Sequence, residues 1–187
     1  MHLKGDTAMS GKIGHYHSPA GRKRFESAYD EGMRTLPPPE AVHDVGTDFG
    51  RVRAYRFGDD PGAPIVLLHA RGATTVMWQP NIPALAEQRR VYSIDLLGEA
   101  GRSEQTAPIR DADDQAAWLA AALVRLEIEA AHLVGVSFGG WMACNQAVRA
   151  PQRVASITPS RRFPSEQSFA PSRQSCRSSE IGLCLGS

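Results

Sequence analysis

Residues 131–141, AHLVGVSFGGW, decide the fold. Ala131–Val136 is a short apolar run of the kind found in strands buried on both faces of a parallel sheet. Residues 135–139 form the motif G-x-S-x-G, and Phe138–Ala150 predicts a helix that Pro151 ends. A serine between two glycines, after a buried strand and before a helix, predicts a sharp turn that lifts the hydroxyl above the sheet.

This turn makes Ser137 a candidate nucleophile. Gly135 and Gly139 stand where larger side chains would clash with the turn. The helix N-terminus directs free N–H groups toward developing negative charge. The backbone N–H of Phe138 is therefore a candidate oxyanion donor. The alternative for the motif alone is a glycine-rich turn that only packs closely.

The segments on either side repeat the alternation of strand and helix. Buried strands are predicted over Pro64–His69, Arg90–Leu97 and Arg153–Thr158. Pro80–Gln88 predicts a helix between the first two of these strands. A further helix, capped by Asp111, carries an apolar stripe at helical spacing formed by Leu119, Ala122, Leu123 and Leu126. Such alternation predicts an α/β fold with a mostly parallel sheet and helices on both faces.

The region before this alternation predicts a different arrangement. Phe25, Tyr29 and Met33 recur at four-residue spacing, which indicates a short amphipathic helix. Ala41–Thr47 and Arg51–Phe57 are strand-like runs on either side of a three-residue turn. They predict an N-terminal antiparallel β-hairpin.

Composition favours one globular domain. The chain has 187 residues, 42% of them hydrophobic, and 21 Lys and Arg against 20 Asp and Glu, so its net charge is +1. This charge gives no reason to expect nucleic acid or an acidic membrane as a partner. No apolar run is long enough to span a membrane, and the N-terminus lacks a secretory h-region, so we expect a cytoplasmic protein.

No cofactor or metal is expected. The chain contains neither the phosphate-binding loop motif nor the dinucleotide-binding glycine motif. Cys144, Cys176 and Cys184 form no disulfide framework or zinc-ligand set. His15 and His17 form an H-x-H pair without a third ligand cluster nearby, and we interpret the pair as part of a solvated tail.

Three regions are expected along the chain: a disordered tail over 1–22, an incomplete domain over 23–158, and an aberrant tail over 159–187. The last region holds eight Ser, four Arg and three Pro without helix or strand period. One interpretation is a disordered extension. The other, which we favour, is translation out of frame or splicing to unrelated sequence. In that case another reading frame after the Ile157 codon should encode further strand–helix units containing an acid and a histidine.

Three motifs together with G-x-S-x-G resemble those of the α/β-hydrolase family, in its carboxylesterase and acyl-hydrolase branch. They are residues 68–73 (LHARGA), residues 77–83 (MWQPNIP) and residues 95–103 (DLLGEAGRS). The last is similar to the family's D-x-x-G-x-G-x-S loop, with one residue more between the glycines.

The resemblance implies roles for named residues. Ser137 would be the nucleophile, and the backbone N–H groups of Phe138 and Arg71 would form the oxyanion hole. His69 would support the oxyanion loop, which is the segment within residues 68–73 that carries Arg71. Ala70 stands where the family usually has Gly, so an unusual backbone angle there would be strained. The Arg71 side chain would attract an anionic substrate or, as we favour, project into solvent.

The family's triad places an acid and then a histidine after the serine. All six histidines precede Ser137: His2, His15, His17, His43, His69 and His132. Only Glu166 and Glu180 follow it as carboxylates. No acid or base is therefore found, and His69 is a poor stand-in because a base needs a free nitrogen within reach of the hydroxyl.

We therefore expect a serine hydrolase of carboxylic esters or similar small acyl substrates, shortened after its sixth strand, with little or no turnover. The exposed edge of that strand would allow self-association. One alternative is a non-catalytic binding module on the same scaffold; another is an enzyme whose base comes from a second chain. The serine does not distinguish an esterase from a thioesterase, an acyltransferase or a C–C hydrolase.

Overall fold

The computed structural model describes residues 13–160. The strands are β1 (Ala41–Thr47), β2 (Gly50–Phe57), β3 (Ile65–Leu68), β4 (Val91–Ile94), β5 (Glu104–Gln105), β6 (Ala131–Val136) and β7 (Val154–Ser160). The helices are α1 (Pro19–Met33), α2 (Ile82–Ala86), α3 (Ala112–Arg125) and α4 (Phe138–Arg149), with short 3-10 helices η1 (Thr75–Trp78) and η2 (Pro151–Arg153). Cys176, Cys184, Glu166, Glu180 and nearly all of the predicted C-terminal tail lie outside the described residues.

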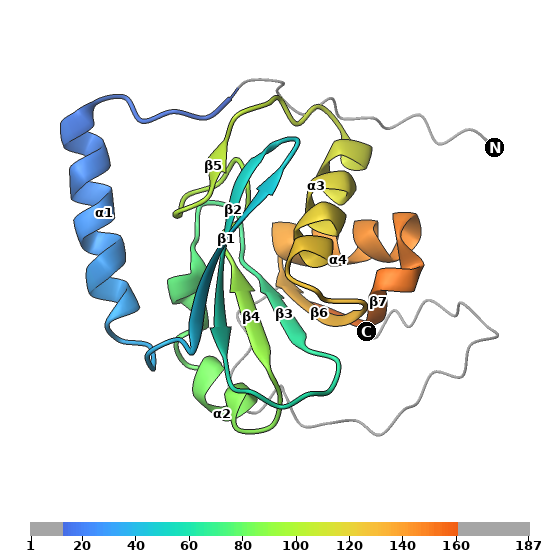
Figure 1. Cartoon of the computed structure of the whole chain (residues 1–187). Coiled ribbons are helices and arrows are strands. Elements are labelled where there is room, and N and C mark those ends of the chain that lie inside the picture. The colour runs from blue at the N-terminus through green and yellow to red at the C-terminus, as the bar shows by residue number, and fades with distance from the viewer. Residues whose placement is uncertain (1–12, 161–187) are drawn as a thin grey trace.

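The strands form one twisted sheet in the order β1-β2-β4-β3-β6-β7, with β5 paired to β2 (Figure 1). The predicted hairpin is confirmed, since β1 and β2 pair antiparallel. The pairs β4–β3, β3–β6 and β6–β7 are parallel. Leu68 at the end of β3 lies opposite Gly135 of β6. The loops that follow these two strands therefore meet at one edge of the sheet.

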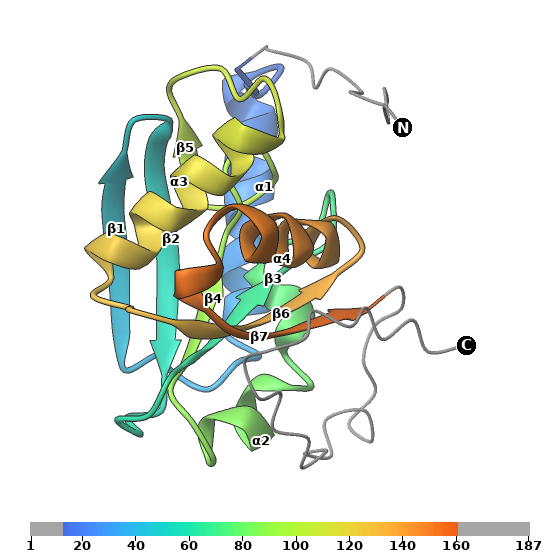
Figure 2. The ribbon, with the colours of Figure 1, turned by 90° about the vertical axis from the view of Figure 1, so that its right-hand side faces the viewer.

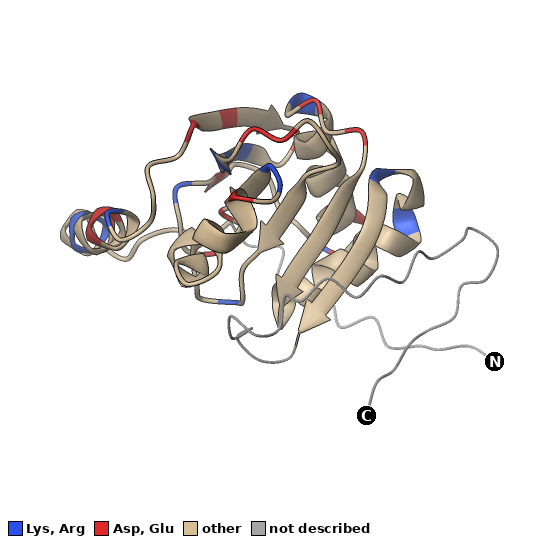
Figure 3. Ribbon diagram, turned by 90° about the horizontal axis from the view of Figure 1, so that it is seen from below, with Lys and Arg blue, Asp and Glu red and all other residues tan. Residues whose placement is uncertain are grey.

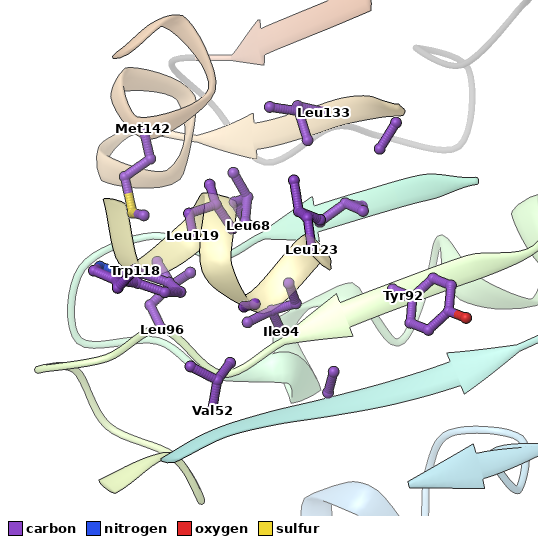
Figure 4. Packing of buried hydrophobic residues seen from close by; sticks show 14 of the residues in the cluster. Val52, Leu68, Tyr92, Ile94, Leu96, Trp118, Leu119, Leu123, Leu133 and Met142 are labelled. Carbon is purple, nitrogen blue, oxygen red and sulfur yellow. The ribbon is translucent and has the colours of Figure 1, made fainter. Parts of the chain in front are cut away.

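Helices cover both faces of the sheet, as predicted. In Figure 2, α3 and α4 lie on one side of β6 and β7, and α2 lies on the other. Alternate β3 residues divide between two core clusters: Leu68 contributes to the cluster with α3 and α4, and Leu67 to the cluster with α1, η1 and α2. Figure 4 shows Leu119 and Leu123 of α3 close to strand residues of the first cluster.

Helix α3 forms as its sequence predicts. The Asp111 carboxylate accepts a hydrogen bond from the Asp114 N–H and caps the helix. All four residues of the predicted stripe are buried: Leu119, Ala122, Leu123 and Leu126.

Several predicted boundaries differ from the structure. Helix α1 begins at Pro19, inside the expected tail, because the Ser18 Oγ accepts from the Gly21 N–H and caps it. Helix α2 begins at Ile82 instead of Pro80, since Pro83 has no N–H and fits only the first turn. Strand β7 continues to Ser160, which lies opposite Val136.

Strand β4 is also shorter than the predicted Arg90–Leu97. It ends at Ile94 because the Leu96 N–H donates to the His69 ring and not to a neighbouring strand. Charged residues lie largely outside the centre of the sheet: β3, β6 and β7 contain no Lys, Arg, Asp or Glu. Figure 3 shows both signs of charge on α1. No helix within residues 13–160 has the length and apolar character needed to cross a membrane.

Candidate active site

Ser137 occupies the turn between β6 and α4 with φ 52° and ψ −111°. The residue is exposed, whereas Val136 before it is buried. A non-glycine residue at positive φ costs about 1–3 kcal/mol and persists only where the surroundings enforce it. The turn therefore has the strained geometry predicted from G-x-S-x-G.

The two glycines of the motif are required by backbone packing. A Cβ on Gly135 would lie 2.2 Å from the Gly139 carbonyl carbon, and a Cβ on Gly139 would lie 2.0 Å from the Leu68 carbonyl oxygen. The start of α4 therefore rests directly on the end of β3. This contact brings Ser137 next to the loop that follows β3.

Backbone hydrogen bonds hold the turn in place. The Ser137 N–H donates to the Ser160 carbonyl at 2.8 Å, and the Ser137 carbonyl accepts from the Trp141 N–H at 2.9 Å. The Ser137 N–H is therefore occupied. Within residues 13–160, no hydrogen bond engages the N–H of Phe138 or of Arg71, the two predicted oxyanion donors.

The loop after β3 forms a tight turn in which the Ala73 N–H donates to the Ala70 carbonyl at 3.1 Å. Positive φ occurs at Gly72 (68°) and not at Ala70. The expected strain at Ala70 is therefore absent, because glycine occupies the position that needs the unusual angle.

The Arg71 side chain is 62% exposed, in line with the interpretation that it projects toward solvent. The sequence does not predict its contacts. Its guanidinium lies 4.4 Å from the centre of the Phe138 ring and 3.6 Å from the Glu99 carboxylate. The Phe138 ring stacks in turn on Trp141 at 5.5 Å between centroids. Arg71 thus connects the oxyanion loop to the residue that follows the nucleophile.

His69 is fully buried and both of its ring nitrogens are engaged. Nε2 accepts from the Leu96 N–H at 2.9 Å, and Nδ1 lies 2.8 Å from the Ala70 carbonyl. One neutral tautomer, with the proton on Nδ1, satisfies both contacts. Burial lowers the pKa of His69 and so favours this neutral form. With no nitrogen free, His69 cannot accept the Ser137 proton.

The other described histidines also lie away from the turn. His132 is near the start of β6, with Nδ1 2.8 Å from the Ser156 Oγ, whereas Ser137 follows the end of the strand. His43 lies on β1, at the opposite edge of the sheet. His15 and His17 precede α1 with their rings 6.3 Å apart, and no group of three or more metal-ligating side chains occurs within 13–160.

A buried carboxylate organises the loop after β4. Asp95 Oδ1 accepts from the Thr75 N–H at 3.0 Å, and Oδ2 accepts from the Tyr29 hydroxyl and the Arg102 N–H, both at 2.7 Å. A Cβ on Gly101, at φ 147°, would lie 2.6 Å from the carboxylate carbon. The D-x-x-G-x-G-x-S pattern could have located this carboxylate, but not its partner on α1.

A cleft of about 1500 Å³ lies away from Ser137. It is bounded by residues 14–19, by α1 and by the loop over 98–106. Four of the five arginines that line it, all except Arg34, pair with nearby carboxylates, as Arg22 does with Glu26 and Arg102 does with Asp30. Most of the positive charge in the cleft is therefore compensated by carboxylates of the chain itself.

Residues 63–160 match the sequence profile described as alpha/beta hydrolase fold. The chain belongs to the α/β-hydrolase family. This membership confirms the resemblance drawn from the motifs and the predicted fold class.

Two members of the α/β-hydrolase family with carboxylesterase names are similar to the chain. Carboxylesterase YbfK of Bacillus subtilis is 34% identical over 131 residues, which are 70% of this chain and 44% of the relative. Its crystal structure superimposes with a TM-score of 0.70 at 33% identity, over 72% of this chain and 47% of that one. Naproxen esterase of B. subtilis gives a TM-score of 0.71 at 30% identity, over 76% and 50%. The chain spans about half the length of these relatives.

Proposed function

We propose that this chain provides the nucleophile and the oxyanion hole of a hydrolase acting on small carboxylic esters. The observation that carries the proposal is the exposed Ser137 at positive φ, between two glycines that tolerate no side chain. The similarity to carboxylesterases supports the ester as the substrate class.

In this mechanism the Ser137 Oγ attacks the ester carbonyl carbon. The carbonyl oxygen takes up negative charge, which the N–H groups of Phe138 and Arg71 stabilise. A general base accepts the hydroxyl proton and later protonates the departing alkoxide. The acyl group remains on Ser137 until water hydrolyses the ester bond.

Within residues 13–160 no histidine is placed to act as the base, since His69 uses both nitrogens for the backbone and His132 and His43 lie away from the turn. We propose that these 187 residues on their own hydrolyse activated esters weakly and unactivated esters not measurably. A serine hydroxyl without a base is a weak nucleophile, so only esters with a good leaving group should react at Ser137. The engaged state of His69 equally favours the second candidate, a non-catalytic module that binds acyl compounds.

Fluorophosphonate labelling tests the proposal, because it requires an activated serine. We expect slow labelling that depends on Ser137, compared with Ser137→Ala and with a control at an exposed serine, Ser27→Ala. Fast labelling lost in Ser137→Ala would show that a base is present and would contradict the weak-turnover proposal. Labelling and aryl-ester hydrolysis unchanged in Ser137→Ala would favour the binding module.

A further inference from the structure

Glu99 lies in the loop after β4, yet its carboxylate contacts the loop after β3. Oε2 accepts a hydrogen bond from the Gly72 N–H at 2.8 Å, and Oε1 lies 3.6 Å from an Arg71 guanidinium nitrogen. The Glu99 side chain is only 10% exposed. A carboxylate this buried is retained where it has partners, and both partners here belong to the oxyanion loop.

The sheet explains how Glu99 reaches this loop. Strands β3 and β4 are parallel neighbours, with Leu68 opposite Ile94, so the loops that follow them lie side by side. Glu99 and Ala100 separate Gly98 from Gly101, where the family pattern has a single residue. The one-residue departure from the pattern thus falls at the position that contacts the oxyanion loop.

The oxyanion loop needs such a tether. Gly72 has the largest backbone freedom of any residue type, and it holds φ 68° in this turn. A Cβ placed on Gly72 would meet no atom within 4 Å, so packing does not confine it. Oxyanion donors must lie within about 2.7–3.1 Å of the developing charge. A free Gly72 would let the neighbouring Arg71 N–H move away from that position.

We propose that Glu99 is a positioning residue for the oxyanion hole, an inference that rests on the proposed ester hydrolysis at Ser137. Its hydrogen bond fixes the Gly72 backbone, and its charge holds the Arg71 guanidinium over the Phe138 ring. Both oxyanion donors, the N–H groups of Arg71 and Phe138, are thereby kept in one arrangement. Glu99 itself contacts no substrate.

Amide hydrogen exchange tests the positioning without requiring activity. We compare the full chain with Glu99→Ala, Glu99→Gln and a control in strand β5, Glu104→Ala, whose side chain is 52% exposed. Glu99→Ala should exchange the Gly72 amide at least about tenfold faster, because its acceptor is lost. Glu99→Gln keeps an acceptor oxygen and should retain most of the protection. Unchanged exchange in Glu99→Ala, or equal exchange in the Gln and Ala variants, would overturn the proposal.

Hydrolysis of p-nitrophenyl acetate links the positioning to the chemistry. Complete loss of one oxyanion donor costs about 10²–10³ in kcat. Glu99→Ala should lower the Ser137-dependent kcat by about tenfold with little change in KM, and Glu99→Gln should restore most of it. A kcat equal to that of Glu104→Ala would overturn the proposal. If wild type and Ser137→Ala hydrolyse the ester equally, the proposed function fails, and the exchange rates alone decide whether Glu99 positions the loop.

Discussion

The His69 ring bridges two loops: its Nε2 accepts from the Leu96 N–H at 2.9 Å, while its Nδ1 lies 2.8 Å from the Ala70 carbonyl. The ring thereby joins the oxyanion loop to the segment after β4. Only the neutral form can make both contacts, since a protonated Nε2 cannot accept.

The hydrogen bond from the Leu96 N–H to His69 Nε2 makes the stability of the folded chain sensitive to acid. The pKa of His69 is lowered in the folded chain, chiefly by burial. As the pH falls, His69 therefore binds a proton in the unfolded chain before it does so in the folded chain. The stabilisation is fully present above the unfolded value of 6.5 and is lost progressively as the pH falls below it. We therefore measure the free energy of unfolding in urea at several pH values. This free energy should depend less steeply on pH in His69→Asn than in wild type.

His132→Asn is the matched control, because burial also lowers the pKa of this more exposed histidine. We expect His132→Asn to change the pH dependence of the free energy of unfolding less than His69→Asn does. If the free energy of unfolding depended on pH identically in wild type and His69→Asn, His69 would be excluded as the source of the acid sensitivity.

The contact between Gly139 and β3 should tolerate no methyl group. In Gly139→Ala the new Cβ would meet three backbone atoms, two of Leu68 and one of His69, within 2.7 Å. We expect a loss of about 1–3 kcal/mol or more in the free energy of unfolding, measured in urea. Gly46→Ala is the control, because its Cβ would meet nothing within 4 Å. Equal losses in the two variants would disprove the close approach of α4 to β3.

The Tyr29 hydroxyl should stabilise the buried carboxylate of Asp95. Tyr29→Phe removes a 2.7 Å hydrogen bond and leaves one carboxylate oxygen with a single partner. We expect a loss of about 1–3 kcal/mol, seen as a lower Tm. Tyr16→Phe changes an exposed tyrosine before α1 and should leave Tm unchanged. A Tm for Tyr29→Phe equal to that of wild type would show that α1 is not anchored through Asp95.

Strain at Ser137 predicts an unusual pair of variants. Glycine relaxes at φ 52°, whereas alanine keeps the Cβ that is strained there. Ser137→Gly should therefore be about 1–2 kcal/mol more stable than Ser137→Ala, although both lack the nucleophile. Equal stabilities of the two variants would mean that the turn stores no strain.

Much of the fold follows from local signals in the sequence. Ala131–Val136 has the bounds expected of β6, because an apolar run between an alanine-rich helix and a glycine turn leaves little freedom. The cap of α3 by Asp111 is equally local. The two-residue strand β5 could not be predicted, since it forms only where β2 passes, about fifty residues earlier in the chain.

In the candidate site, too, local features could be predicted and long-range contacts could not. The turn at Ser137 depends on neighbouring glycines and could be predicted from the sequence. The contacts of Arg71 and Glu99 join loops that only the parallel pairing of strands brings together. Arg71 was expected in solvent because long charged side chains usually are, and the Phe138 ring beneath it could be located only in the structure.

The central claim is that Ser137 is a nucleophile beside an oxyanion hole for which residues 13–160 supply no base. The most direct test is release of p-nitrophenolate from p-nitrophenyl acetate by the purified 187-residue chain, by Ser137→Ala and by His69→Asn. We expect weak hydrolysis that falls to the buffer rate in Ser137→Ala and persists in His69→Asn as long as that variant stays folded. Equal rates in wild type and Ser137→Ala, or fast hydrolysis abolished in a folded His69→Asn, would contradict the account.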